Sequence, residues 1–206
     1  MGKCRKSISK IKMNNAVFLD RDGVINYPVL NPKTNEYEAP HNKNDLKLFP
    51  GVIESLKELL ALNYKLFLIS NQPDYAKGKT SFEGLQSVHK QLNSILTENN
   101  ILFIEYYYCY HHPQGIISEY STPCECRKPG NLFLRKAELQ YSLNMPSSWM
   151  IGDRDSDIYC GQSMGLKTIL IKQFHSDGKS GQSNPEYKAE SLIKAVSIIK
   201  TNTGRN

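Results

Sequence analysis

The chain has 206 residues, of which 39% are hydrophobic, which is enough for one sizeable core and too little for two ordinary domains. Its net charge of +6 arises almost entirely in the first twelve residues, MGKCRKSISKIK, which hold five basic and no acidic side chains. The rest of the chain is close to neutral, and this balance argues against a protein that binds nucleic acid over its whole surface.

We interpret residues 1–14 as a basic N-terminal tail, residues 15–201 as a single domain and residues 202–206 as a C-terminal tail. The tail lacks the apolar run of a secretory signal, and no stretch reaches the ~18 apolar residues that cross a bilayer. A myristoylation motif needs Ser or Thr where this chain has Lys6. We therefore expect a cytoplasmic protein without a membrane partner.

From residue 15 onward, short apolar runs alternate with segments of helical period, a pattern typical of a mainly parallel sheet covered by helices. The expected strands are, in chain order, 16–20, 64–70, 101–109, 148–151 and 167–171. Helices are expected at 52–62, at 82–96 after a capping box of Thr80 and Glu83, from about residue 131, and at 188–200.

Three segments interrupt this alternation. Residues 27–45 and 110–130 are predicted to be loops because each contains several prolines among polar neighbours, and residues 173–187 form a polar connection rich in Gly, Ser and Asn. Long loops in a compact domain are usually functional or disordered.

Polar side chains stand where three of the expected strands end. Asp20, Ser70 and Asp153 follow apolar runs, and in a parallel sheet the carboxyl ends of the strands meet at one edge, where ligands gather. Carboxylates that approach one another need a hard cation such as Mg2+ between them. Such a site can transfer a phosphoryl group to a carboxylate if the protein also supplies a positive charge, for which Arg127 and Lys128 are candidates.

A second group of side chains has the spacing of a metal site. The chain has five cysteines, an odd number that argues against a disulfide framework in the absence of a signal peptide. Cys109 and His111 form one close pair, Cys124 and Cys126 form another, and twelve residues separate the pairs. This set matches a closed, structural Zn2+ site. His112 is the alternative histidine ligand.

The motifs LDRDGVIN, ISNQ, the lysine of CRKP, and GDRDSD occur in this order, each at an expected strand end or helix start. Over residues 15–172 the chain thereby resembles the haloacid dehalogenase-like phosphatases. The resemblance implies an α/β fold, a Rossmann-like three-layer α/β/α sandwich with a mainly parallel central sheet, a minimal cap and, here, a zinc-binding loop at 109–126.

Residue roles follow from the resemblance, position by position. It implies that Asp20 is the nucleophile that becomes an aspartyl-phosphate and that Asp22 is the general acid and then the general base. It also implies that Ser70 and Lys128 bind the transferred phosphoryl group. Asp153 is implied to hold Mg2+ with the Asp20 carboxylate and the Asp22 backbone carbonyl.

Two neighbouring positions fit the same pattern. Gly23 suits a sharp turn with little side-chain bulk, and Asp157 is expected to support the acidic cluster. Asp155 and Asp157 also have a simpler explanation, because the helix dipole favours acidic residues in the first turn of any helix.

The combination of CxHHPQG, the twelve-residue loop and CxCRKP narrows the resemblance to the D-glycero-D-manno-heptose 1,7-bisphosphate 7-phosphatases of bacterial heptose biosynthesis, which supply lipopolysaccharide or surface glycans. Their CxH pattern favours His111 over His112 as the zinc ligand. The resemblance implies a sugar-phosphate substrate, whose second phosphate Arg127 would bind. Further substrate contacts are predicted at Arg21, Asn71, Gln72 and Arg154. We expect a monomer.

Alternatives remain open. Histidinol-phosphate phosphatases share the zinc site but have a shorter loop between the ligand pairs. The segment 73–75 and the long loop at 27–45 depart from the family pattern, and both concern substrate recognition more than chemistry. Two other possibilities are a zinc-stabilised nucleic-acid-binding module that uses the basic tail and a catalytically idle protein that only binds sugar phosphates.

Overall fold

The computed structural model describes residues 13–32, 34–176 and 178–203. The basic segment 1–12 therefore lies outside the described residues. A six-stranded parallel sheet runs in the order β5-β4-β1-β6-β7-β8. Its strands are β1 (Ala16–Leu19), β4 (Lys65–Asn71), β5 (Phe103–Cys109), β6 (Trp149–Gly152), β7 (Lys167–Ile171) and β8 (Tyr187–Ala189). The predicted mainly parallel sheet is confirmed.

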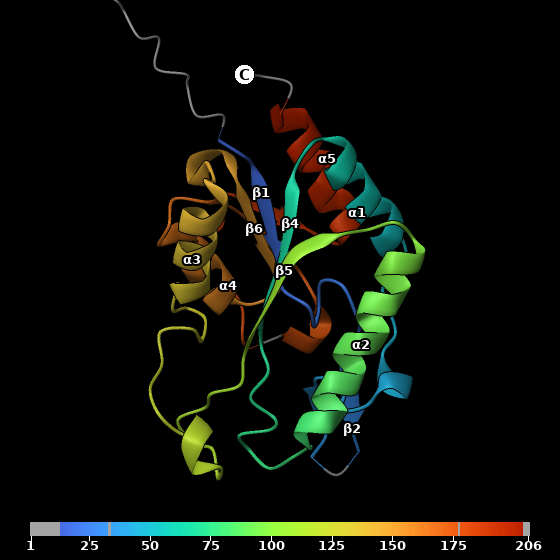
Figure 1. The fold of residues 1–206 in the computed structure, drawn as a ribbon, viewed down its shortest axis with the longest axis vertical. Coiled ribbons are helices and arrows are strands. Elements are labelled where there is room, and N and C mark those ends of the chain that lie inside the picture. Colours follow the sequence, from blue (N-terminus) through green and yellow to red (C-terminus); the bar gives the residue numbers. More distant parts are fainter. Residues whose placement is uncertain (1–12, 33, 177, 204–206) are drawn as a thin grey trace, which may run out of the picture.

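Helices cover both faces of the sheet, as the three-layer prediction requires. They are α1 (Val52–Ala61), α2 (Phe82–Glu98), α3 (Leu132–Tyr141), α4 (Asp155–Gln162) and α5 (Leu192–Thr203). Figure 1 shows α1, α2 and α5 on one face and α3 and α4 on the other. Short 3-10 turns lie at Lys43–Asp45, Ser118–Tyr120, Met145–Ser147 and Phe174–Ser176.

The alternation of side chains along β1 explains why the sheet has two cores. Val17 and Leu19 point to one face and pack with apolar residues of α1, α2 and α5. Ala16 and Phe18 point to the opposite face and pack with residues of α3 and α4. All four are fully buried, so a central strand in this fold has no polar side and reads as a continuous apolar run.

The predicted capping box of Thr80 and Glu83 is wrong by one residue. Ser81 is the N-cap of α2, since its Oγ accepts a hydrogen bond from the Gly84 amide at 3.1 Å. The Thr80 hydroxyl instead donates to the His41 carbonyl oxygen at 3.5 Å. A serine next to a threonine offers two equivalent caps, and the contact with His41, which is distant in sequence, decides between them.

Two regions predicted as irregular contain short strands. Residues 27–45 include an antiparallel hairpin of β2 (Val29–Asn31) and β3 (Glu36–Glu38). The connection 173–187 leads into β8, which adds a sixth strand at the edge of the sheet. Each of these strands has only three residues, too few for alternation to stand out from a polar background.

The boundaries of the domain stay a prediction. Regular structure extends slightly past both, because Asn14 pairs with Leu143 and α5 continues to Thr203. No helix among the described residues has the length and apolar character needed to cross a membrane.

The order of the strands fixes where a ligand can bind. The chain runs outward from β1 through β4 to β5 and then returns to β6 on the other side of β1. Such a reversal leaves a crevice outside the carboxyl ends of the two strands, here β1 and β6. In Figure 1 this edge of the sheet lies at the lower end, towards the β2–β3 hairpin.

Candidate active site

Asp20 and Asp153 meet at this crevice. Asp20 follows β1 and Asp153 follows β6, and the Asp20 amide donates to the Ile151 carbonyl oxygen at 3.0 Å. A carboxylate oxygen of Asp20, one of Asp153 and one of Asp157 all lie within 4.8 Å of one another. The structure thus brings together the two aspartates that were predicted to share a cation and Asp157, from the first turn of α4, which was expected to support them.

Two glycines make room for this cluster. Gly23 has a φ of +87°, and a Cβ there would lie 2.3 Å from the Asp153 Oδ2. A Cβ on Gly152 would lie 2.1 Å from the Cβ of Asp157. Contacts this short do not occur between real atoms, so a larger residue at either position would displace a carboxylate of the cluster.

The cluster fits a hard divalent cation. Asp153 is fully buried, and its Oδ1 has no hydrogen-bond partner, which is costly unless a ligand completes the site. Burial, together with the negative charges of Asp20 and Asp157, raises the pKa of Asp153 to about 7. All the donor atoms are oxygens, the set that Mg2+ prefers. The Ser176 hydroxyl donates to the other oxygen of Asp153.

Lys128 places a positive charge against the same carboxylates. Its Nζ lies 3.0 Å from the Asp20 Oδ1 and 2.5 Å from the Asp157 Oδ1, and it donates to the Ile69 carbonyl oxygen at 2.8 Å. Burial alone lowers the pKa of Lys128, but the carboxylates of Asp157 and Asp20 raise it above its usual value. The amine is therefore charged in its buried position.

Asp22 is held by a buried hydrogen-bond network. Its carboxylate lies 3.1 Å from the Arg21 Nη2, and it accepts from the Gln72 Nε2 at 2.6 Å and the Asn26 Nδ2 at 2.9 Å. Arg21 and Gln72 are each only 1% exposed and do not line the pocket. Their contact with substrate stays a prediction, and in this structure both side chains hydrogen-bond the Asp22 carboxylate and hold it in position.

Ser70 and Asn71 end β4 beside this network. The buried Ser70 Oγ accepts from the Gln72 Nε2 at 3.0 Å. Asn71 lines the pocket and holds the backbone of Lys128 through two hydrogen bonds, from the Lys128 amide at 3.0 Å and to its carbonyl oxygen at 3.1 Å. Asn71 therefore both borders the crevice and fixes the segment that carries the lysine.

Cys109, His111, Cys124 and Cys126 converge as predicted, with one potential ligand atom from each lying within 4.8 Å of the others. The sulfur of Cys126 lies 3.2 Å from that of Cys109 and 3.6 Å from the His111 Nδ1. Three thiols and one imidazole are a donor set that suits tetrahedral Zn2+. The cluster also orients a pocket residue, because the Arg127 Nη1 donates to the His111 carbonyl oxygen at 3.2 Å.

His112, the alternative zinc ligand, turns away from the thiols. It lines the pocket, and its Nδ1 accepts from the Gln114 amide at 3.1 Å. The remaining ring nitrogen therefore carries the proton in the neutral ring and can act as a donor. The structure places His111, and not His112, in the thiol cluster.

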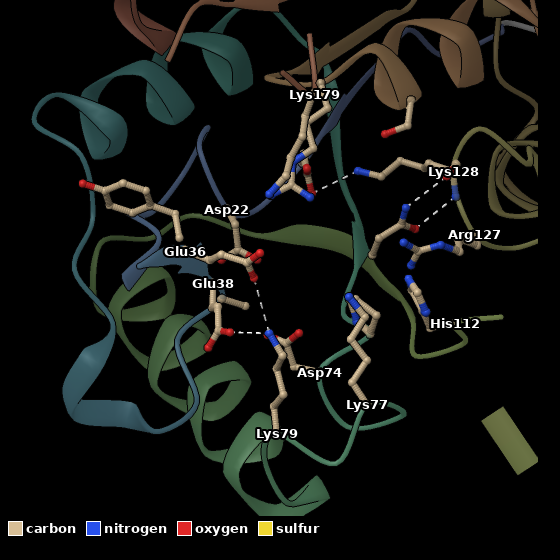
Figure 2. Close-up of a pocket in the computed structure, with 17 residues that line it drawn as sticks. Asp22, Glu36, Glu38, Asp74, Lys77, Lys79, His112, Arg127, Lys128 and Lys179 are labelled. Atoms are coloured by element: carbon tan, nitrogen blue, oxygen red, sulfur yellow. Dashed lines mark hydrogen bonds and ion pairs between the residues drawn. The ribbon is translucent and has the colours of Figure 1, made fainter. Parts of the chain in front are cut away.

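A pocket of about 420 Å³ opens over the aspartates. Figure 2 shows Lys128 and Arg127 on one side of it and Glu36 and Glu38 of the β2–β3 hairpin on another, with Lys179 opposite Lys77. The hairpin is held in place by an ion pair between Glu38 and Lys79.

Six lysine and arginine side chains line the pocket, and they fall into two groups. Three have carboxylate partners: Lys79 pairs with Glu38, Lys128 with Asp20 and Asp157, and Arg154 with Asp153 at 4.0 Å. Among the described residues, the other three have no carboxylate oxygen within 4.0 Å: Lys77, Arg127 and Lys179. Burial and the nearby charge of Arg154 lower the pKa of Arg127. Three of the six cations that line the pocket are thus left without an ion pair among the described residues.

Sequence reasoning missed several of these residues. Lys77 and Lys179 follow no motif, and the hairpin that carries Glu36 and Glu38 was predicted as a loop. Nothing in the polar connection 173–187 distinguishes Lys179 from other exposed lysines.

Comparisons with known proteins identify the family of this chain. The profile of the HAD-hydrolase-like family matches residues 125–195. A D-glycero-alpha-D-manno-heptose-1,7-bisphosphate 7-phosphatase of Photorhabdus laumondii is 33% identical over 81% of this chain and 86% of its own length. A D-glycero-beta-D-manno-heptose-1,7-bisphosphate 7-phosphatase of Haemophilus influenzae is 30% identical over 91% of this chain and 98% of its own.

Solved structures share the fold. The D,D-heptose 1,7-bisphosphate phosphatase of B. bronchiseptica, solved with magnesium and phosphate, superposes with a TM-score of 0.75 at 19% identity over 91% of this chain and 99% of its own. A putative HAD-like phosphatase of Mesorhizobium loti gives the same TM-score at 22% identity over 94% of this chain and 89% of its own. The chain therefore belongs to the haloacid dehalogenase-like family of phosphatases.

Proposed function

We propose that this phosphatase removes the 7-phosphate from a D-glycero-D-manno-heptose 1,7-bisphosphate in a Mg2+-dependent reaction. The observation that carries the proposal is the presence of three pocket cations without a carboxylate partner, in addition to a lysine that is already paired at the aspartate cluster. A second phosphate on the substrate would give these three cations an anionic partner. The names of the relatives support the same substrate and include both anomers of the sugar.

In the first step, a carboxylate oxygen of Asp20 attacks the phosphorus of the 7-phosphate. The bond from phosphorus to the sugar oxygen breaks, and Asp22 transfers its proton to that oxygen, which leaves as the sugar hydroxyl. Lys128, next to Asp20, neutralises the charge of the phosphoryl group in flight, and Ser70 donates a hydrogen bond to it.

In the second step, water attacks the aspartyl-phosphate and gives its proton to Asp22. The bond between phosphorus and Asp20 breaks, which releases inorganic phosphate and restores both carboxylates. Asp20, Asp153 and the carbonyl oxygen of Asp22 would hold Mg2+. When bound, this cation neutralises the phosphate oxygens and so allows a carboxylate to approach them.

The thiol cluster would hold a structural Zn2+ through Cys109, His111, Cys124 and Cys126. Its four donors would complete a closed tetrahedral site without an open position for substrate. Its contribution would be to fix the loop that carries Arg127 and Lys128 at the rim of the pocket.

A phosphate-release screen with Mg2+ tests the proposal. It compares both anomers of the heptose 1,7-bisphosphate, the heptose 7-phosphate, other sugar phosphates and histidinol phosphate. We expect the highest kcat/KM with one heptose bisphosphate anomer and no release by Asp20→Asn with any substrate. Faster turnover of histidinol phosphate than of every heptose phosphate would refute the substrate assignment.

A further inference from the structure

Lys179 enters the pocket from a segment that carries none of the four motifs. It lines the pocket from the connection between β7 and β8, and it has no carboxylate oxygen within 4.0 Å among the described residues. Figure 2 shows its side chain directed into the pocket across from Lys77. Lys179 is exposed; partial desolvation and the nearby charge of Arg154 lower its pKa, and the carboxylates of Glu36 and Asp153 oppose this shift. An anion between these cations would relieve their repulsion.

Asp155 ties the backbone of this segment to the start of α4. Its carboxylate accepts hydrogen bonds from the amides of Gly181 at 3.0 Å, Gln182 at 2.9 Å and Ser183 at 2.9 Å, and from the Ser183 hydroxyl. The Asp155 amide in turn donates to the Lys179 carbonyl oxygen at 3.0 Å. Five hydrogen bonds thus join one residue of α4 to the loop that carries the lysine.

This arrangement separates Asp155 from its acidic neighbours. The cluster consists of Asp20, Asp153 and Asp157 and does not include Asp155. The helix dipole accounts for an acidic residue in a first turn, but it does not require three consecutive amides to converge on one carboxylate. Asp155 therefore holds the loop beside the pocket and takes no part in the acidic cluster.

We propose that Lys179 is a specificity-determining residue that binds the non-reacting phosphate of the substrate, and that Asp155 is the positioning residue that holds Lys179 at the pocket. The inference rests on the proposed bisphosphate substrate and deepens it. Lys128 already supplies the positive charge at the reacting end through its contact with Asp20. Like Lys77 and Arg127, Lys179 has no carboxylate partner among the described residues. These cations can therefore bind a second anionic group of the substrate.

The test compares kcat and KM for a heptose 1,7-bisphosphate and the matching heptose 7-phosphate, with Mg2+ present. Lys179→Gln should raise KM for the bisphosphate about tenfold and leave kcat within about twofold, because a contact to a charged group is lost away from the reacting atoms. Its effect on the monophosphate should be small. Lys179→Arg should retain most of the preference for the bisphosphate.

Asp155 variants test the positioning role. Asp155→Ala should raise KM for the bisphosphate in the same direction as Lys179→Gln, and Asp155→Asn, which keeps one acceptor oxygen, should rescue part of the loss. The double variant Asp155→Ala with Lys179→Gln should be no worse than the poorer single variant, because both changes remove the same contact. Lys172→Gln is the matched control, since this exposed lysine lies in the same connection and does not line the pocket.

Two results would overturn the inference. One is that Lys179→Gln has the same ratio of kcat/KM for the bisphosphate to kcat/KM for the monophosphate as the unmodified protein. The other is that kcat falls equally for both sugars in this variant. Failure of the proposed function looks different, because it shows in the unmodified protein, which would then release phosphate from neither sugar or turn over histidinol phosphate faster than both. In that case the affinity for inorganic pyrophosphate, measured by calorimetry, tests whether Lys179 contacts an anion. An affinity about tenfold weaker in Lys179→Gln than in Lys172→Gln supports the anion contact, and equal affinities refute it.

Discussion

The carboxyl group of Asp153 depends on a neighbour that has no side chain. Gly23 follows the DxDG aspartates directly, and its positive φ and its closeness to Asp153 are two separate requirements. The first is a matter of backbone strain, which costs of order 1 kcal/mol for an alanine. The second is a matter of geometry at the predicted cation site. Different variants can separate the two.

Gly23→Ala should weaken Mg2+ binding more than it lowers the stability of the fold. The added Cβ would displace the Asp153 carboxylate, so we expect the Mg2+ concentration at half-maximal activity to rise about tenfold or more, in line with the sensitivity of metal ligands to displacement. The measurement is a Mg2+ titration of phosphate release. Gly165→Ala is the control, since Gly165 has a φ of +68° but nothing within 4 Å of an added Cβ.

Loss of the charge on Lys128 should affect both chemistry and stability. In Lys128→Met, the Asp20 and Asp157 carboxylates lose the ion-pair partner that separates them. We expect kcat to fall on the order of 1,000-fold, as for other cations that balance a transferred phosphoryl group. The free energy of unfolding should fall by about 3 kcal/mol. Single-turnover kinetics and urea denaturation measure the two effects, and a kcat within tenfold of the unmodified protein would contradict the role.

At the scale of elements, the thiol cluster connects a loop without its own apolar core to the pocket. Residues 110–130 contain only the short turn Ser118–Tyr120 as regular structure. Their contact with the pocket includes the hydrogen bond from Arg127 to the His111 carbonyl oxygen. Loss of order in this loop should therefore weaken substrate binding more than it slows the chemical step.

Cys126→Ser should remove bound zinc and raise KM more than it lowers kcat. We expect about one zinc per chain in the unmodified protein by elemental analysis, and a large loss in the variant because thiolates dominate the donor set. Cys160→Ala is the matched control, since Cys160 is buried against the Gly130 carbonyl oxygen, outside the cluster. Equal zinc contents in the two variants would rule out the predicted ligand set.

Long elements could be predicted from the sequence, and short ones could not. The five strands of four to seven residues follow clear apolar runs. The pairing of β1 with β6, which brings Asp20 beside Asp153, was implied only by the family resemblance and is shown by the structure. The hairpin of β2 and β3 was missed, because its three-residue strands lie among prolines. Ser81 was passed over as a cap because the choice between it and Thr80 depends on His41.

The candidate site was predictable where local motifs define it and not where tertiary contacts do. Asp20 and Lys128 stand in recognisable motifs. By contrast, no local pattern shows that the Arg21 guanidinium hydrogen-bonds Asp22 and Gln72 in the interior. The role of Lys179 depends on the hydrogen bonds of Asp155 to residues more than twenty positions away, and no local pattern reveals such contacts.

At the scale of the whole molecule, the acidic cluster links cation binding to folding. Burial raises the pKa of Asp153 to about 7, and burial also raises the pKa of Asp157 above its usual value. In the unfolded chain both groups titrate near the ordinary value of about 3.9. Between these pH values the folded, metal-free protein binds more protons than the unfolded chain, so its free energy of unfolding falls as the pH rises.

The metal-free protein should therefore lose stability between about pH 4 and pH 7 through this cluster, by up to about 4 kcal/mol for Asp153 alone. Mg2+ binds the ionised carboxylates, so it should raise the melting temperature more at pH 8 than at pH 5. Thermal denaturation with EDTA or with Mg2+ at both pH values measures this difference. In Asp153→Asn the loss attributable to Asp153 should disappear and the effect of Mg2+ should be small at either pH. An equal stabilisation by Mg2+ at pH 5 and pH 8 in the unmodified protein would mean that the cation binds elsewhere.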